Sequence, residues 1–162
     1  MNPVVAYIAL GANLGSPRET VRQAMTGLDH LPETRLLKSS SLYQSAPLGL
    51  LDQPDFINAV AAVETTLPAV ALLQALLDAE QRQGRVRSIA NAPRTLDLDL
   101  LLYGDLVLDT PALTLPHPRL HLRAFVLEPL AEIAPDLTLP GRGSVAAWRP
   151  ALRNQTIRRL PC

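Results

Sequence analysis

Two aspartates spaced two residues apart, Asp97 and Asp99, are the side chains in this sequence best suited to hold a divalent cation. Successive side chains of a strand point to opposite faces, so both carboxylates would share one face, about 6.5 Å apart. The other face would then carry Leu96, Leu98, Leu100 and Leu102. Mg²⁺ is held by one or two carboxylates together with water and phosphate oxygens. The pattern predicts phosphate chemistry, and the alternative is two solvated acids on an exposed strand.

An arginine-rich segment without apolar periodicity comes directly before these aspartates. Residues 81–94 contain Arg82, Arg85, Arg87 and Arg94, together with Gly84 and Pro93. Guanidinium groups match phosphate oxygens bidentately. We interpret the segment as a lid that brings arginines onto bound phosphates, and the alternative is an ordinary solvated loop.

Two more stretches carry side chains suited to ligand binding. Phe56 and Asn58 follow a long loop over 44–55 and would share a strand face. A phenyl ring can stack on a flat heterocycle while the amide bonds to its edge, but a core Phe beside a loop-bonding Asn is equally compatible. His117 lies between Pro116 and Pro118, so its backbone has little freedom and its ring a fixed direction. The alternative is a structural histidine.

Hydrophobic patterning predicts the elements that position these residues. A strand is expected over Val4–Leu10, followed by a turn at 11–15 and a capping box from Ser16 to Glu19. An amphipathic helix follows, with Val21, Ala24, Met25, Leu28 and Leu31 on its apolar stripe. Later expected elements are strands over Arg35–Tyr43 and Phe56–Thr65, a helix from Pro68 toward Gly84, a hairpin partner at Leu106–Leu108 for the aspartate strand, and a helix over Leu122–Glu132 broken near Pro129.

This order of elements predicts an α+β sandwich, with helices packed on one mostly antiparallel sheet. The 162 residues suit a single domain over 1–162, in which the tail 136–162 has signals too weak to assign. Equal numbers of acids and bases, 15 of each, give no net field to attract nucleic acid or an anionic membrane. The single Cys162 excludes an intrachain disulfide, and the apolar run at 4–10 is too short to span a bilayer. We therefore expect a cytoplasmic monomer.

Five blocks of residues, in their order and spacing, resemble a known enzyme family. They are Gly11-Ala12-Asn13-Leu14-Gly15; Pro47-Leu48-Gly49 with Asp52-Gln53-Pro54 and Phe56-x-Asn58; Gly84-Arg85-x-Arg87; Pro93-Arg94-Thr95-Leu96-Asp97-Leu98-Asp99; and Pro116-His117-Pro118. The series is similar to the 6-hydroxymethyl-7,8-dihydropterin pyrophosphokinases of folate biosynthesis, over about residues 4–135. The resemblance implies a ferredoxin-like α/β fold and a diphosphotransferase. Such an enzyme uses ATP with two Mg²⁺ ions, passes pyrophosphate to the pterin hydroxymethyl group and releases AMP.

The resemblance also implies a role for each matching residue. Asp97 and Asp99 would be the metal ligands, and Arg85 and Arg94 would act with them in catalysis. The pterin pocket would be formed by Ser45, Ala46, Leu48, Phe56, Asn58 and Phe125. The nucleotide site would be formed by Glu80, Arg85, Arg87, Arg94, Thr114, His117 and Arg123. Ala90 and Asn91 depart from the family pattern, which often has a basic and an aromatic residue there.

Two alternatives of other classes are compatible with the aspartate pair. One is a metal-dependent nucleotidyl- or glycosyltransferase, which also uses an Asp-x-Asp motif but needs a larger binding region. The other is a non-catalytic pterin- or nucleotide-binding module, which would tolerate the loss of one Asp. Release of AMP from ATP in the presence of the hydroxymethyl pterin is expected only of the pyrophosphokinase.

Overall fold

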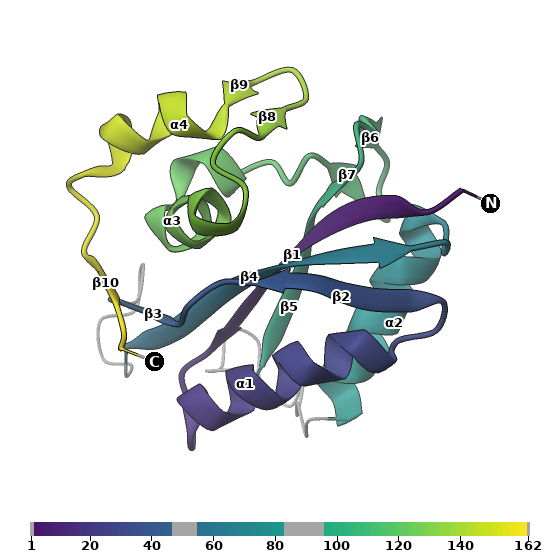
Figure 1. Cartoon of the computed structure of the whole chain (residues 1–162), viewed down its shortest axis with the longest axis horizontal. Helices are drawn as coiled ribbons and strands as arrows, with labels where there is room; N and C mark the ends of the chain where they lie inside the picture. The colour runs from purple at the N-terminus through teal and green to yellow at the C-terminus, as the bar shows by residue number, and fades with distance from the viewer. Residues whose placement is uncertain (1, 47–54, 83–95, 162) are drawn as a thin grey trace.

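The computed structural model describes residues 2–46, 55–82 and 96–161. In these ranges six strands form one antiparallel sheet, in the order β10-β3-β4-β1-β5, with β2 paired to a second stretch of β4 (Figure 1). The strands are β1 (Val4–Ala12), β2 (Thr34–Ser39), β3 (Tyr43–Ser45), β4 (Phe56–Thr65), β5 (Asp97–Tyr103) and β10 (Ile157–Arg159). The predicted α+β sandwich with an antiparallel sheet is confirmed. The tail belongs to the same sheet, because β10 pairs with β3.

Helices cover both faces of the sheet (Figure 1). On one face α1 (Pro17–Gly27) and α2 (Ala69–Arg82) pack against the alternate side chains of β1 that include Ile8 and Leu10. On the other face α3 (Ala124–Ile133) and α4 (Val145–Trp148) pack against Val60 and Ala62 of β4. Because β4 is covered on both sides, its apolar run is nearly continuous rather than alternating. Short ribbons complete the described fold: β6 (Leu108–Asp109) with β7 (Thr114–Leu115), and β8 (Thr138–Leu139) with β9 (Gly143–Ser144).

The first strand and helix lie close to their predicted bounds. The whole apolar stripe from Val21 to Leu31 is buried, as expected of an amphipathic helix. The predicted capping box is wrong: Ser16 is the N-cap, but its side chain makes no capping hydrogen bond, and its carbonyl accepts from Thr20 N instead. Gly11, expected in the turn, continues β1, and Gly15 with φ +64° takes the left-handed turn position.

The strand expected over 35–43 is split into β2 and β3. At the break Ser40 still contacts β4. Its backbone N donates to Val60 O at 2.9 Å, and its hydroxyl, in place of a backbone carbonyl, accepts from Val60 N at 2.9 Å. The next residue turns to α3, where the Glu132 carboxylate accepts from Ser41 N at 3.0 Å and from the Tyr43 hydroxyl at 2.7 Å. The stabilising partner is about 90 residues away, so no local pattern signals this break.

The aspartate strand β5 contains a bulge that the alternation did not predict. Its register with β1 passes from Ile8↔Leu100 to Tyr7↔Leu102, so Leu101 is the extra residue. Leu102 therefore packs on the α3 side, whereas Leu98 and Leu100 pack on the α1–α2 side. The expectation that Leu102 shares their face was wrong, because one inserted residue reverses every later side chain.

Two further expectations after β5 were also wrong. The segment Leu106–Leu108 does not pair with β5; Leu108 pairs with Leu115, and the exposed Val107 packs little. The helix over 124–133 is not broken at Pro129, which is buried inside it. Proline removes one helix hydrogen bond, and here the burial of residues on both sides of it offsets that loss.

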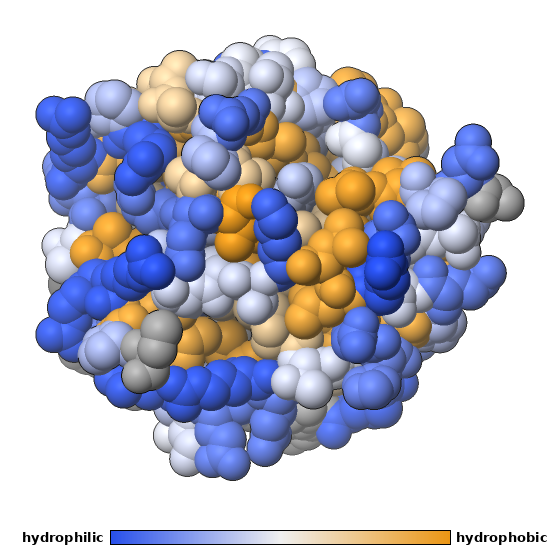
Figure 2. Space-filling view, viewed as in Figure 1, coloured by the Kyte–Doolittle hydropathy of each residue, from blue (hydrophilic) through white to orange (hydrophobic). Residues whose placement is uncertain are grey.

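In the described part of the chain, no helix is both long and apolar enough to cross a membrane. Hydrophilic side chains interrupt the apolar surface on the face shown in Figure 2. The exposed large apolar side chains are spread over several elements: Val5, Leu37, Val70, Leu106, Val107 and Leu122.

Candidate active site

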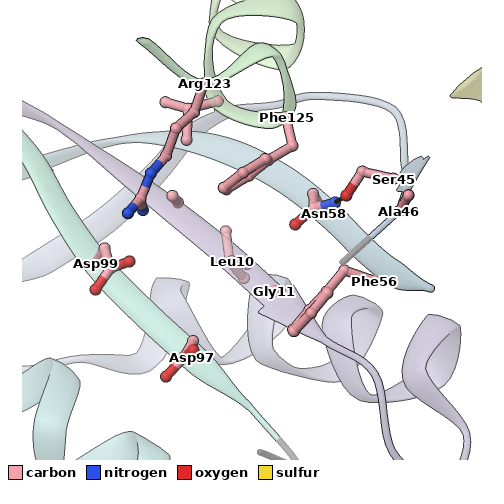
Figure 3. A pocket seen from close by; sticks show the side chains of 12 residues that line it. Leu10, Gly11, Ser45, Ala46, Phe56, Asn58, Asp97, Asp99, Arg123 and Phe125 are labelled. Atoms are coloured by element: carbon pink, nitrogen blue, oxygen red, sulfur yellow. Dashed lines mark hydrogen bonds between the residues drawn. The ribbon is translucent and has the colours of Figure 1, made fainter. Parts of the chain in front are cut away.

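A cavity of about 200 Å³ opens on the α3 side of the sheet, beside the first residues of β5. Eight predicted site residues line it: Ser45, Ala46, Phe56, Asn58, Asp97, Asp99, Arg123 and Phe125 (Figure 3). They come from β3, β4, β5 and the start of α3. Residues far apart in the chain are therefore brought to one place by the sheet order.

The two aspartates lie on one face of β5, at one wall of this cavity (Figure 3). Pairing of Asp97 with Gly11 and of Asp99 with Ala9 fixes them beside β1. Leu98 between them points into the opposite core and is 3% exposed. Asp99 is exposed and Asp97 half-buried, so a solvated cation has access to both carboxylates.

Glu80 of α2 holds the strand between the two aspartates. Its side chain is only 2% exposed, and its carboxylate accepts a hydrogen bond from Leu98 N at 2.9 Å. Among the described strands β5 is at the edge of the sheet, so none of them lies on that side to bond to this N–H. A buried carboxylate at this point fixes the backbone from which Asp97 and Asp99 project.

An amide and two phenyl rings form the other wall. The Asn58 side chain donates from Nδ2 to Ser45 Oγ at 2.7 Å, and both residues are 5% exposed. This bond fixes the amide orientation and leaves Oδ1 on the side of Gly11. Phe56 at the start of β4 and Phe125 in the first turn of α3 project on either side of the amide (Figure 3). The arrangement suits a flat, polar-edged ring system.

Arg123 places a positive charge between the two walls. As the N-cap residue of α3 it precedes Phe125, and its guanidinium carbon lies 5.5 Å from the centre of that ring. This is within cation–π distance. In Figure 3 the guanidinium group points toward the side of the cavity where Asp99 lies. A cation here can contact an anionic group held near the aspartates.

His117 is fixed through its backbone and its ring. Its N donates to Leu101 O at the bulge of β5 at 2.9 Å, and its Nδ1 accepts from Arg119 N at 3.2 Å. Burial, together with the charges of Arg123, Arg142 and Arg119, lowers the pKa of His117 to about 4. The ring is neutral at pH 7, and because Nδ1 is an acceptor, Nε2 carries the proton.

Some predicted site residues do not line the cavity. Glu80 contacts β5 from the α2 side, and Thr114 lies in the β6–β7 ribbon, opposite Asp109. His117 is likewise absent from the described lining. The predicted roles of Leu48, Arg85, Arg87 and Arg94, and with them the arginine lid, lie outside the described residues.

Sequence reasoning missed four residues that line the cavity: Ala9, Leu10, Gly11 and Val126. Three of them present only backbone or apolar surface, for which the sequence holds no chemical signal. Gly11 did carry one, because a glycine next to a strand often marks a close approach. A Cβ atom there would lie 3.3 Å from Asn58 Oδ1, which is tight.

Comparisons with known proteins agree with this geometry. A family model described as "7,8-dihydro-6-hydroxymethylpterin-pyrophosphokinase (HPPK)" matches residues 7–135. The chain is 50% identical over 155 residues to the 2-amino-4-hydroxy-6-hydroxymethyldihydropteridine pyrophosphokinase of Pseudomonas aeruginosa, covering 96% of both chains. It is 50% identical over 137 residues to the protein of the same name from Haemophilus influenzae, covering 85% of this chain and 86% of that one.

Solved structures of low sequence identity support the fold alone. A crystal structure of an HPPK-DHPS protein in complex with substrates superposes with a TM-score of 0.73 at 12% identity. The match covers 93% of this chain but only 43% of that longer one. A Plasmodium falciparum HPPK-DHPS with pteroate gives 0.72, also at 12% identity, over 93% of this chain and 42% of the other. The predicted ferredoxin-like α/β fold is confirmed.

Proposed function

Because the chain belongs to the 7,8-dihydro-6-hydroxymethylpterin-pyrophosphokinase family, we propose that it transfers pyrophosphate from ATP to the hydroxymethyl group of 6-hydroxymethyl-7,8-dihydropterin. AMP is the other product, and the reaction serves folate biosynthesis. The observation that carries the proposal is the cavity itself. It combines a site for a flat heterocycle with two carboxylates suited to a phosphate-bound cation, within a volume of about 200 Å³.

The pterin occupies the wall formed by Phe56, Phe125 and Asn58. Its two ring faces stack on the phenyl groups, and the amide of Asn58, oriented by Ser45, bonds to the heterocycle edge. Both polar residues are buried, so a ring that lacks matching donors and acceptors would leave them unpaired. This favours a pterin over an apolar ring of the same size. The loop containing Leu48 is proposed, from the family resemblance, to complete this pocket.

Asp97 and Asp99 are the proposed ligands of Mg²⁺. Their donor set fits this ion, because two carboxylate groups leave most coordination positions to water and phosphate oxygens. Among the described residues no third His, Cys, Asp or Glu joins them in a cluster, so a dedicated all-protein cage is not formed there. When bound, such ions neutralise phosphate charge and lower the pKa of the attacking hydroxyl group. Two ions are expected from the family.

The chain's own residues supply positioning and charge. Arg123, beside the aspartates, is placed to contact phosphate oxygens while its charge also lies over Phe125. His117, neutral and protonated on Nε2, can donate a hydrogen bond to a phosphate or to the leaving AMP. Arg85, Arg87 and Arg94, with Thr114 and Glu80, complete the proposed nucleotide site on the strength of the resemblance alone. Phosphoryl-type transfer is mostly positioning and charge stabilisation, so no protein base is required.

The test is a product analysis. The protein is incubated with ATP, Mg²⁺ and 6-hydroxymethyl-7,8-dihydropterin, and nucleotides are separated by chromatography. Equimolar AMP and pterin diphosphate are expected, with no AMP when the pterin is omitted. Release of free pyrophosphate with retention of the AMP moiety would instead indicate a nucleotidyltransferase. Binding of both substrates without any AMP would indicate a non-catalytic module.

A single domain over 1–162, a monomeric state and residence in the cytoplasm stay predictions.

A further inference from the structure

An arginine from the C-terminal tail reaches into the loop that carries His117. Arg142 lies in the turn between β8 and β9, and its Nη1 donates to the carbonyl oxygen of His117 at 2.6 Å. Its Nη2 donates to the carbonyl of Pro116 at 3.4 Å. Its Nη1 also lies 3.2 Å from Nδ1 of His121. Arginine has no acceptor, so His121 Nδ1 must accept in this contact.

Arg142 is itself held in place on the tail. Its backbone N donates to Leu139 O at 3.0 Å, and its carbonyl accepts from Trp148 Nε1 at 2.8 Å. The Trp148 ring meets the His121 ring edge-on, with ring centres 4.6 Å apart. Gly141 and Gly143 on either side have φ values of +73° and +89°, so the turn needs glycine at both positions. The guanidinium group is therefore presented from a fixed backbone.

The His117 loop is thus held from two directions. On the sheet side the backbone N of His117 donates to Leu101 O at the bulge of β5, at 2.9 Å. On the tail side the carbonyls of Pro116 and His117 accept from one guanidinium fork. Prolines on both sides of His117 have no N–H with which to anchor the loop. Together these contacts fix the backbone position from which the His117 side chain projects.

We propose that Arg142 is a positioning residue of the nucleotide site, which holds the backbone of His117 so that its imidazole faces the phosphates. This proposal rests on the proposed function, because it assumes that the His117 ring is directed at the phosphates of bound ATP. The three contacts direct the guanidinium of Arg142 at the loop, so Arg142 acts through His117 and not on substrate. Its charge has a second effect: burial is the main cause of the low pKa of His117, and Arg142, with Arg123 and Arg119, lowers this pKa further.

The experiment compares Arg142→Ala, Arg142→Lys and a matched control, Arg149→Ala. Arg149 is an arginine of the same tail whose ion pair, at 2.7 Å, is with Glu128 of α3 and so involves no residue of the His117 loop. In Arg142→Ala we expect the Michaelis constant for ATP to rise on the order of tenfold, since a charge-assisted fork is lost. The constant for the pterin should change less than about twofold, because none of the described pterin-side residues hydrogen-bonds to Arg142. In Arg149→Ala both constants should stay at wild-type values.

A second readout follows His117 directly, without ATP. The chain has 3 histidines, so ring ¹⁵N signals can be assigned with a His117→Asn variant and titrated. We expect the pKa of His117 to rise above its value of about 4 in Arg142→Ala and to stay below 6.5, because burial and the other two arginines still lower it. In Arg149→Ala this pKa should stay unchanged. A merely structural role would lower the unfolding midpoint without separating the two Michaelis constants.

Arg142→Lys keeps the charge and loses the fork, so it should lie between wild type and Arg142→Ala. If Arg142→Ala fails to fold, Arg142→Lys provides the test, because its Michaelis constant for ATP should rise while the constant for the pterin does not. Michaelis constants that rise together, or a His117 ring that titrates as in wild type in both variants, would overturn the proposal. If the wild-type protein releases no AMP, the proposed function fails, while the titration still tests whether Arg142 lies close enough to act on the His117 ring.

Discussion

Gly11 on β1 lies opposite Asn58 on β4, and a Cβ atom at Gly11 would lie 3.3 Å from the side-chain oxygen of Asn58. That distance is shorter than ordinary van der Waals contact, so one of the two residues would have to shift. The Asn58 amide has little freedom to do so, because it is buried and bonded to Ser45 at 2.7 Å. The absence of a side chain at Gly11 is therefore needed for the observed position of the Asn58 side-chain amide.

Gly11→Ala should weaken pterin binding while leaving the fold intact. The added methyl group displaces the amide by a few tenths of an ångström, which misaligns its bonds to the heterocycle edge. We expect the dissociation constant for the pterin to rise about tenfold, since displacements of this scale at a positioning contact are costly. Isothermal titration calorimetry with the pterin and with an ATP analogue measures both constants. The ATP constant should not change.

Gly27→Ala is the matched control for Gly11→Ala. Gly27 is the last residue of α1, its φ is −62°, and a Cβ there meets nothing within 4 Å. Alanine at such a position should stabilise the fold by about 0.4–1 kcal/mol and leave both ligands unaffected. Equal losses of pterin affinity in the two variants would show that the effect at Gly11 is not local.

Asn58→Ala should cost about 1–3 kcal/mol of pterin affinity, because the bonding groups of the heterocycle edge lose their partner. The unpaired Ser45 hydroxyl adds a small loss of stability. Affinity for an ATP analogue should barely change, since Asn58 lies on the far wall from the aspartates (Figure 3). Calorimetry that found the larger loss for the nucleotide would count decisively against the proposed pterin pocket.

Asp97→Asn and Asp99→Asn should each abolish most turnover and keep the fold. Both changes conserve volume and remove one charge from the proposed Mg²⁺ ligands. Relief of repulsion between the carboxylates leaves thermal unfolding in the absence of metal unchanged or slightly improved. Asp105→Asn, an exposed acid in the turn after β5, is the control and should retain full turnover. Wild-type rates in either site variant would falsify the assignment.

The low pKa of His117 predicts a pH window for stability. The folded pKa is about 4 and the ordinary value is 6.5, so between these values the unfolded chain binds more protons. Stability should therefore rise with pH across this window, level off above it and be lost as the pH falls toward 4. Urea unfolding at several pH values measures the slope. His117→Asn should flatten this slope, and an unchanged slope would contradict a neutral, half-buried ring.

Local patterns in the sequence predicted most of the fold. Strand alternation and helical stripes depend on neighbouring residues, and β4 and the stripe of α1 lie where they were expected. The errors have different causes. The break after β2 depends on Glu132, about 90 residues away in the chain, and no window of a few residues contains such a partner. The partner of Leu108 is the nearby Leu115 rather than β5, and the apolar pattern did not distinguish these two pairings.

In the candidate site, too, some features were predicted from the sequence and others were not. Residues with distinctive chemistry, such as Asp97, Phe56 and Asn58, were predicted and now line one cavity. Arg142 was not, because a lone arginine in a weakly patterned tail gives no sign that it meets His117, 25 residues away in the chain. The fold brings the tail elements β8, β9 and α4 beside α3 (Figure 1), and the contact of Arg142 with His117 depends on that arrangement.

Variants of Glu80 can distinguish two interpretations of this residue: that it holds strand β5, or that it contacts the nucleotide. If its main task is to bond Leu98 N, Glu80→Ala leaves that buried donor unpaired and should cost about 1–3 kcal/mol of unfolding free energy. Turnover should fall with it, because Asp97 and Asp99 project from the same backbone. Glu80→Gln retains an acceptor oxygen, so it should recover most of both losses.

A direct nucleotide contact at Glu80 predicts the opposite pattern. Glu80→Gln would then raise the Michaelis constant for ATP although stability is kept. Asp78→Ala, on the exposed side of α2, controls for changes in the helix. Asp78 accepts one side-chain hydrogen bond from the described residues, that of Gln74, so this variant should stay within about 0.5 kcal/mol of wild type. Because Glu80 is 2% exposed and already bonded to β5 in the absence of ligand, we expect the strand-holding pattern. Urea unfolding and ATP kinetics on the three variants decide between the two.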